Sequence, residues 1–143
     1  MPIYCFGKSL WISVLLIATA SAAGASERLL TILATDNQET QMMALVLTTQ
    51  AHNQGAEVSI LLCGEAGYLA TEIHESKTFA PAGRSPRDLL RNLQANGVKV
   101  AVCAIFLPQR ELDETALWDG VTVARPPEVA ALMMQKDVKL LTF

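Results

Sequence analysis

Five short apolar runs, each about the length of a β-strand, alternate along the chain with segments that carry helix signals. Most of these runs are apolar throughout and do not alternate with polar residues. We therefore expect strands that are buried on both faces, as in a parallel sheet. The expected strands cover residues 29–35, 56–63, 98–103, 121–123 and 138–142.

Capping signals between the runs predict the helices. Asp36 has capping-box spacing to Glu39, and the helix that follows should end just before Gly55. Ser85 has the character of an N-cap, with Pro86 at the first helical position. Other helices are expected over 68–73, 108–118 and 126–135, with a Pro/Gly loop over 77–84.

Strands and helices that alternate in this way predict an α/β protein with three layers, α/β/α, in which helices cover both faces of a five-stranded, mainly parallel sheet. We expect the doubly wound strand order 2-1-3-4-5. In that order, a crevice opens between the carboxyl ends of the first and third strands, where such folds bind ligands.

The first 25 residues have the pattern of a secretory signal peptide. Lys8 precedes an uncharged apolar stretch of 11 residues, from Leu10 to Ala20. Small residues then offer cleavage positions at Ala22, Ala23 and Ala25. Because about 20 apolar residues are needed to cross a bilayer, we expect a cleaved signal over 1–25 and one mature domain over 26–143. The mature protein would be periplasmic or secreted and free of the membrane; an uncleaved N-terminal anchor is the alternative.

Composition excludes several classes of function. The chain has 11 basic and 14 acidic residues; without the single lysine of the signal, 10 basic residues remain and the formal charge is −4. This charge gives no electrostatic case for nucleic acid. The loop after the first strand has no glycine, so a phosphate-binding turn for a cofactor is not expected. The two histidines and the cysteines lack metal-ligand spacing, so no metal is expected either.

Two cysteines remain after the expected cleavage, Cys63 at the end of the second strand and Cys103 at the end of the third. In the order 2-1-3 they would lie two strand spacings apart, roughly 10 Å. A disulfide needs Cα atoms within about 7 Å. We therefore expect no bridge, with Cys63 as a buried apolar side chain and Cys103 at the crevice.

Cations are expected to gather near Cys103. Arg87 lies at the start of the helix that precedes the strand of Cys103, and Arg110 lies seven residues after Cys103. A nearby cation favours the thiolate, which is the nucleophilic form of cysteine. Asp36 and Asn37, after the first strand, should line the same crevice. The alternative is a solvated rim of arginines that never approaches the sulfur.

The mature chain resembles the DsrE/DsrF-like family, which includes the DsrE- and TusD-type sulfur-relay proteins. The resemblance rests on residues 29–35, I-L-L-C-G-E-A-G (60–67), N-G-V-K-V-A-V-C-A (96–104), Q-R-E-L-D-E-T-A (109–116) and D-V-K-L-L-T-F (137–143). In sulfur-carrying members, a cysteine that ends the third strand is followed by a small or apolar stretch, an arginine and an acidic helix. Cys103 and Arg110 match the cysteine and an arginine of that pattern.

The resemblance implies a sulfur carrier or sulfurtransferase, in which Cys103 accepts sulfane sulfur as a persulfide and passes it to a partner thiol. Donor and acceptor proteins or small sulfane-sulfur compounds would be its partners, and a homo-oligomer, a trimer or hexamer, is expected. The segment from Tyr68 to Arg84 would cover the site. The alternative is a non-catalytic oligomeric protein of the same fold that binds a small ligand or a partner. The sequence leaves open whether the protein turns over substrate or only shuttles sulfur.

Overall fold

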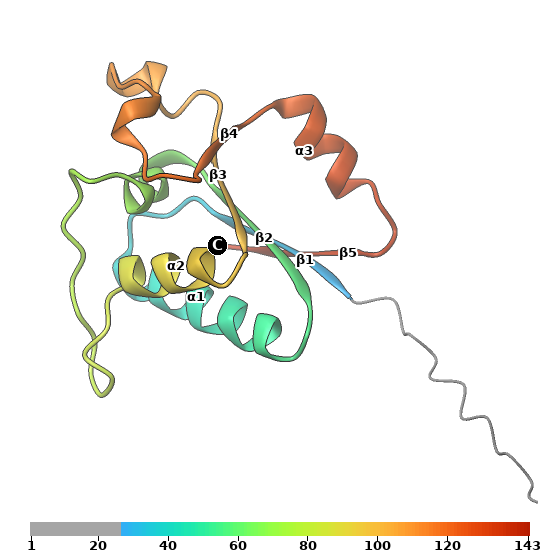
Figure 1. The fold of residues 1–143 in the computed structure, drawn as a ribbon, viewed down its shortest axis with the longest axis horizontal. Coiled ribbons are helices and arrows are strands. Elements are labelled where there is room, and N and C mark those ends of the chain that lie inside the picture. Colours follow the sequence, from blue (N-terminus) through green and yellow to red (C-terminus); the bar gives the residue numbers. More distant parts are fainter. Residues whose placement is uncertain (1–26) are drawn as a thin grey trace, which may run out of the picture.

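A five-stranded, fully parallel sheet forms the centre of the computed structural model, which describes residues 27–143 (Figure 1). The strands are β1 (Arg28–Leu33), β2 (Glu57–Leu62), β3 (Lys99–Cys103), β4 (Thr122–Ala124) and β5 (Val138–Thr142). Each corresponds to one of the apolar runs. The expected signal peptide over 1–25 lies outside the described residues.

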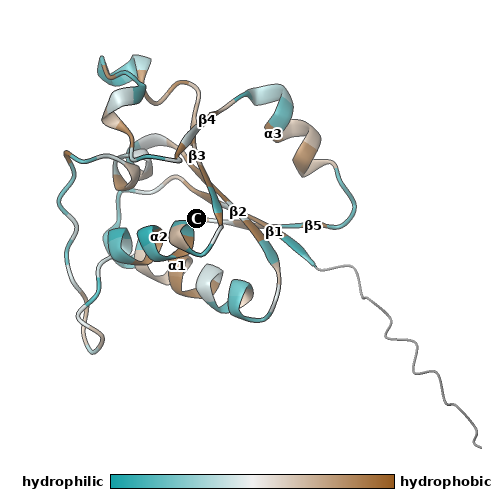
Figure 2. Ribbon diagram, viewed as in Figure 1, coloured by the Kyte–Doolittle hydropathy of each residue, from teal (hydrophilic) through white to brown (hydrophobic). Residues whose placement is uncertain are grey.

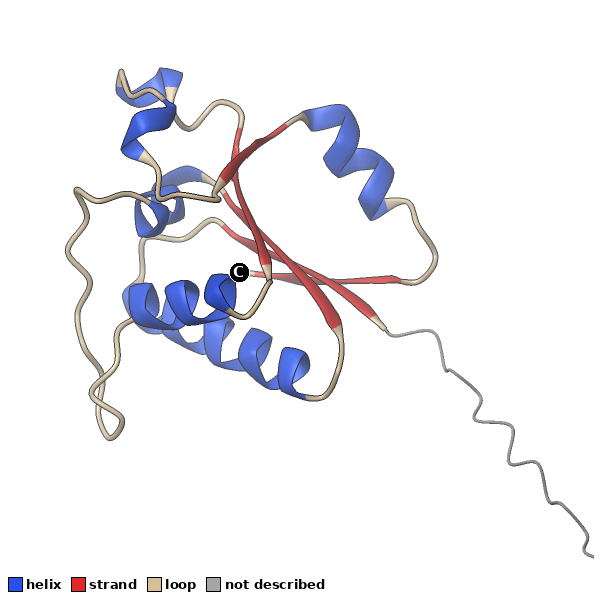
Figure 3. Ribbon diagram, viewed as in Figure 1, coloured by secondary structure: helices blue, strands red, loops and turns tan. Residues whose placement is uncertain are grey.

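Helices cover both faces of the sheet, which confirms the three-layer prediction (Figure 3). The helices α1 (Gln38–Asn53) and α2 (Pro86–Ala95) lie on one face, and α3 (Pro126–Met133) lies on the other. Three short 3₁₀ helices, η1 (Gly64–Ala70), η2 (Pro108–Arg110) and η3 (Glu114–Ala116), follow the ends of β2 and β3. Among the described residues, no helix is both long and apolar enough to cross a bilayer.

The strand order is β4-β3-β2-β1-β5, so the predicted order 2-1-3-4-5 was wrong. Crossovers between parallel strands are right-handed, so successive steps in one direction place their helices on the same face. The chain takes two such steps through helices, from β1 through α1 to β2 and from β2 through α2 to β3, and a third step in the same direction from β3 to β4. Its direction reverses only after β4, when α3 crosses the other face and β5 pairs with β1. As a result β2, and not β1, is the neighbour of β3.

The face beneath α1 and α2 holds the main hydrophobic core. Inward side chains of β1, β2 and β3 meet the buried faces of the two helices there, each at most 2% exposed: Leu33, Leu45, Ile60, Leu62, Leu90, Leu93, Val100 and Val102. Burying a side chain of this size contributes about 1.5–3 kcal/mol. This layer therefore supplies the stability on which the edge loops are built.

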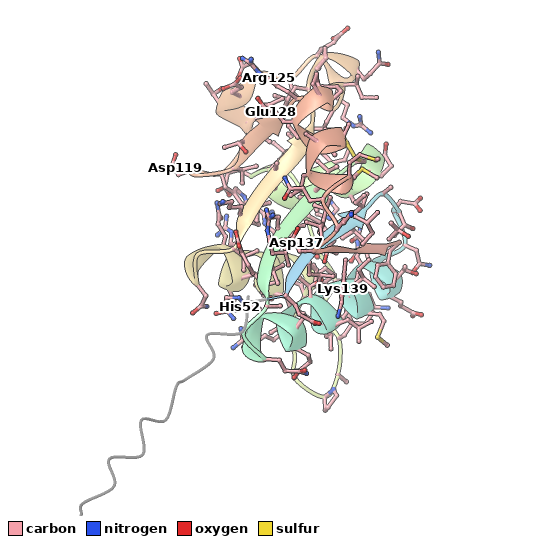
Figure 4. The ribbon with its side chains drawn as sticks, turned by 90° about the vertical axis from the view of Figure 1, so that its right-hand side faces the viewer. His52, Asp119, Arg125, Glu128, Asp137 and Lys139 are labelled. Carbon is pink, nitrogen blue, oxygen red and sulfur yellow. A yellow bond between two sulfur atoms is a disulfide. The ribbon has the colours of Figure 1, made fainter. Side chains whose placement is uncertain are left out.

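The opposite face is only thinly covered. No residue of α3 is buried, and two cavities, of about 330 and 240 Å³, open between this helix and the strands. The C-terminal half of α3 is apolar (Figure 2), and Met134, which caps the end of this helix, is 83% exposed. Charged residues mark the margins of this face, with Arg125 and Glu128 at the start of α3 and Lys139 on β5 (Figure 4).

The capping predictions were confirmed for α2 and displaced by one residue for α1. The Ser85 hydroxyl accepts from the backbone N–H of Asp88, whose carboxylate accepts in return from the N–H of Ser85. The hydrogen bonds that the Asp88 carboxylate accepts, first from the Ser85 backbone N–H and then from the Ser85 hydroxyl, hold the pKa of Asp88 below its ordinary value. The N-cap of α1 is Asn37 and not Asp36, because it is the Asn37 side chain that accepts from Thr40 N, at 2.9 Å.

The helix predicted over 108–118 is instead two 3₁₀ turns, η2 and η3. Glu111 takes the left-handed conformation, with φ of 54°, and ends the first turn. Asp113 then starts the second turn by accepting a hydrogen bond from Thr115 N at 2.8 Å. The helix predicted over 68–73 also differs, since it begins directly after Cys63 as η1.

Candidate functional site

The two cysteines form a disulfide that joins the carboxyl ends of β2 and β3. Their Cα atoms are 5.2 Å apart. The register that pairs Leu61 with Ala101 and Leu62 with Val102 continues directly to this pair. The prediction that the cysteines would not bridge was wrong, because it placed β1 between two strands that are neighbours.

Cys103 forms part of the wall of an apolar cavity of about 330 Å³ between the end of the sheet and α3. Its other lining residues are apolar too, among them Leu61, Ile105, Val129 and Met133. Since side chains alternate along a strand, Cys103 shares its face with Ala101 on the side that α3 covers. Both cysteines are half-buried, so the bridge is within reach of solvent and of small molecules.

The loops that follow the two cysteines are packed against each other. The N–H of Phe106 donates to the carbonyl of Cys103 at 2.9 Å, and that of Ala66 donates to the carbonyl of Cys63 at 3.1 Å. The Phe106 ring is 1% exposed and lies so close to Gly67 that a Cβ there would overlap it. A glycine at this position thus lets the chain after Cys103 turn back over η1.

Arg110 joins the same two loops and is absent from the lining of the apolar cavity. Its guanidinium pairs with Glu65 at 2.6 Å. It lies over the Phe106 ring, 4.6 Å from the centroid, and over the Tyr68 ring at 5.1 Å. The contacts of Arg110 therefore fix the loops behind the disulfide.

Arg87 is held in another place, between α2 and the segment after η1. It forms an ion pair with Glu72 at 3.0 Å, donates to the carbonyl oxygen of His74 and lies 5.0 Å from the Trp118 ring centroid. These contacts anchor the start of the segment that was expected to act as a cover. They do not bring Arg87 into the cavity that Cys103 lines.

A second cavity, also of about 330 Å³, is polar and lies beside the end of β1. Asp36 and Gln41 line it together with His74. Gln41 is 2% exposed and its Oε1 has no hydrogen-bond partner among the described residues, while its amide donates to Thr35 O at 2.8 Å. Burial, and then the charge of Arg87, hold the pKa of His74 below its ordinary value, so the imidazole is neutral at neutral pH.

The structure thus separates the residues predicted to share one crevice. Cys103 lines the apolar cavity and Asp36 the polar one, and these two cavities have no lining residue in common. Asn37 caps α1. Roles for these residues and the two arginines in binding remain predictions. Among residues 27–143, no cluster of three or more His, Cys, Asp or Glu side chains is arranged to hold a metal ion.

Sequence reasoning missed Cys63 as a site residue. Its signal was present, since Cys63 and Cys103 both follow directly on the apolar run of a strand. Only the order of the strands places the two side by side.

Residues 28–143 match the model of the DsrE/DsrF-like family. The chain belongs to the DsrE/DsrF-like family. This confirms the resemblance and relates the protein, in general terms, to sulfur relay. No curated protein matched the sequence.

Solved structures show the same fold. The ychN protein from E. coli is 20% identical, with a TM-score of 0.67 over 83% of this chain and 100% of that one. MTH1491, a protein of unknown function from Methanobacterium thermoautotrophicum, is 13% identical, with a TM-score of 0.62 over 82% of this chain and 100% of that one. At these identities the likeness concerns the fold alone.

Replacing Gly67 by alanine should destabilise the protein by about 1–3 kcal/mol, the usual cost of forcing extra volume into a packed site. The added methyl would press on the Phe106 ring. Chemical denaturation measures the change in the free energy of unfolding. The loss should be much smaller when Gly67→Ala is made in a Phe106→Leu background; equal losses in both backgrounds would disprove the contact.

Opening the disulfide should lower the free energy of unfolding by about 3–4 kcal/mol, because the bond closes a loop with a sequence separation of 40 in the unfolded chain. Denaturation of the wild type with and without a thiol reductant measures this. Cys63→Ser and Cys103→Ser should have about the same free energy of unfolding as the reduced wild type, and the reductant should not change it. A wild type whose stability is unchanged by reductant would contradict the bridge.

Proposed function

We propose that this protein carries sulfane sulfur as a persulfide on Cys103 and delivers it to the thiol of a partner. The observation that carries the proposal is the place of Cys103 in a DsrE/DsrF-like chain. This residue is half-buried at the carboxyl end of β3, in the wall of a cavity large enough for a small sulfur compound. The thiol becomes available when the bridge to Cys63 is open.

The apolar cavity suits this chemistry. A persulfide on Cys103 would place its outer sulfur beside apolar side chains such as Val129 and Met133. The exposed Ile105, 70% accessible, stands at the rim of the cavity and offers an apolar contact to an incoming partner. Arg110 and Phe106 fix the loops that follow Cys63 and Cys103. These loops hold the sulfur of Cys103 toward the opening of the apolar cavity.

The disulfide also supports the proposed export to the periplasm or beyond. Disulfides persist in oxidising compartments and are rare in the cytosol. The signal-like segment over 1–25 and the bridge between Cys63 and Cys103 agree on this point.

A homo-oligomer is part of the proposal, supported by the surface of α1. This helix buries two polar residues, Gln41 and Thr48, and exposes three apolar ones. The exposed residues, Met43, Val46 and Leu47, have the spacing of a single helix face. An apolar stripe that faces outward is typical of a helix that packs against a second copy of the chain.

A polar cavity favours a second candidate function, the binding of a small ligand without catalysis. The unpaired Oε1 of Gln41 and the carboxylate of Asp36 would accept hydrogen bonds from such a ligand. In this alternative Cys103 takes no part, and the disulfide only stabilises the fold.

Sulfur loading tests the main proposal. After the disulfide is reduced and the reductant removed, inorganic polysulfide should add one sulfur atom to Cys103. Alkylation followed by peptide mass mapping locates the added sulfur and separates Cys103 from Cys63 and Cys5. Cys63→Ser, which cannot re-form the bridge, should keep the added sulfur on Cys103, and Cys103→Ser should load at background level. Equal loading of Cys103→Ser, or no loading of Cys63→Ser, would leave the ligand-binding alternative.

Placing a charge on the α1 stripe should weaken the oligomer without unfolding the protein. We expect Leu47→Glu to shift the protein toward the monomer in size-exclusion chromatography with light scattering, because the carboxylate would have to be buried at the interface. Thr78→Glu, which adds the same charge on an exposed loop, should leave the size unchanged. A wild type that is monomeric at high concentration would end this part of the proposal.

A further inference from the structure

We infer that Cys63 is a second reacting residue, and that the Cys63–Cys103 disulfide is the form of the protein that accepts hydrogen sulfide. The inference rests on the proposed role of Cys103 as the sulfur carrier. It names one sulfur source, inorganic sulfide, and assigns a role to a residue for which the sequence predicted none.

The step balances without any further oxidant. The sulfide sulfur attacks Sγ of Cys103, a new S–S bond forms between them, and the bond from Cys103 to Cys63 breaks. Its electron pair leaves with the sulfur of Cys63, which takes up the proton released by the sulfide. The sulfide sulfur is oxidised to sulfane sulfur and the disulfide is reduced, so that one H₂S converts the bridge into a Cys103 persulfide and a Cys63 thiol. This is thiol–disulfide exchange with sulfide as the nucleophile.

The geometry decides which sulfur is attacked. Only Cys103 of the pair contributes to the lining of the apolar cavity between β3, β4 and α3. A nucleophile that enters this cavity meets Cys103 first, with Cys63 as the leaving group.

The cavity also favours sulfide over larger thiols. About 330 Å³ accommodates a small molecule, and no charged side chain lines the space. Neutral H₂S has little hydration to lose on entry, whereas a thiol that carries carboxylates or ammonium groups would have to leave them unpaired in apolar surroundings. The site therefore discriminates by polarity.

The fold keeps Cys63 beside Cys103 after the bridge opens. Pairing of β2 with β3 runs up to Leu62 and Val102, and the Phe106 ring remains packed against Gly67. Cys63 is then placed to attack the inner sulfur of the persulfide, which would restore the bridge and release H₂S. A partner thiol has to take the outer sulfur before this reversal occurs.

The test compares two redox forms of the wild type, so it does not depend on whether a variant folds. Oxidised and fully reduced protein, both free of reductant, are incubated without air with the same sodium sulfide solution and then alkylated. Peptide mass mapping should find one extra sulfur on Cys103 and an alkylated Cys63 in the oxidised sample, and no extra sulfur in the reduced one. The reduced sample also controls for polysulfide in the reagent, which would load Cys103 or, after attack by Cys63, re-form the disulfide.

Three results would overturn the inference. They are an intact disulfide after exposure to sulfide, a disulfide opened without sulfur retained on either cysteine, and sulfur retained on Cys63. Failure of the proposed function is seen separately, in the loading of Cys63→Ser from polysulfide. If Cys63→Ser loads from polysulfide while the oxidised wild type ignores sulfide, the carrier role stands and the role of Cys63 fails. If neither loads, both fail.

Discussion

The parallel pairing of β2 with β3 is the constraint on which the candidate site depends. Registered hydrogen bonding sets the two strands side by side, and so it sets Cys63 against Cys103 where the strands end. The positions of the two loops after these strands follow from that pairing. The two loops that leave the strands must pack on one another, which the contact of Phe106 with Gly67 and the ion pair of Arg110 with Glu65 achieve.

Local signals in the sequence predicted the elements well, while the order of the strands escaped them. Ser85 caps α2 as predicted because a capping box needs only residues four positions apart or fewer. Strand order depends on the direction in which each crossover connection moves along the sheet. An apolar run such as 98–103 would fit beside β1 as well as beside β2. Because of this one wrong adjacency, the prediction placed Cys63 too far from Cys103 for a bond. It also placed Asp36 in the same crevice as Cys103. The family resemblance points to Cys103 without any strand order, because it rests on a motif.

The two faces of the sheet differ in how tightly they are packed, and the proposed chemistry lies on the looser one. The face under α1 and α2 buries large aliphatic side chains almost completely. The face under α3 is open, with two cavities and a helix that buries none of its residues. A reactive sulfur on the first face would be sealed off. On the second face, Cys103 combines a rigid strand beneath it with free access above.

A disulfide in this position can serve as more than a brace, because the fold does not depend on it to keep its two ends together. The strand ladder, the Phe106 ring and the Arg110 ion pair all hold the same loops, so breaking the S–S bond removes a constraint on the unfolded chain and leaves the native contacts in place. A disulfide that opens and closes needs this kind of support, because its two cysteines must stay close enough to re-form the bond. A disulfide that only stabilises the fold does not need a cavity beside it, whereas the disulfide between Cys63 and Cys103 lies beside one.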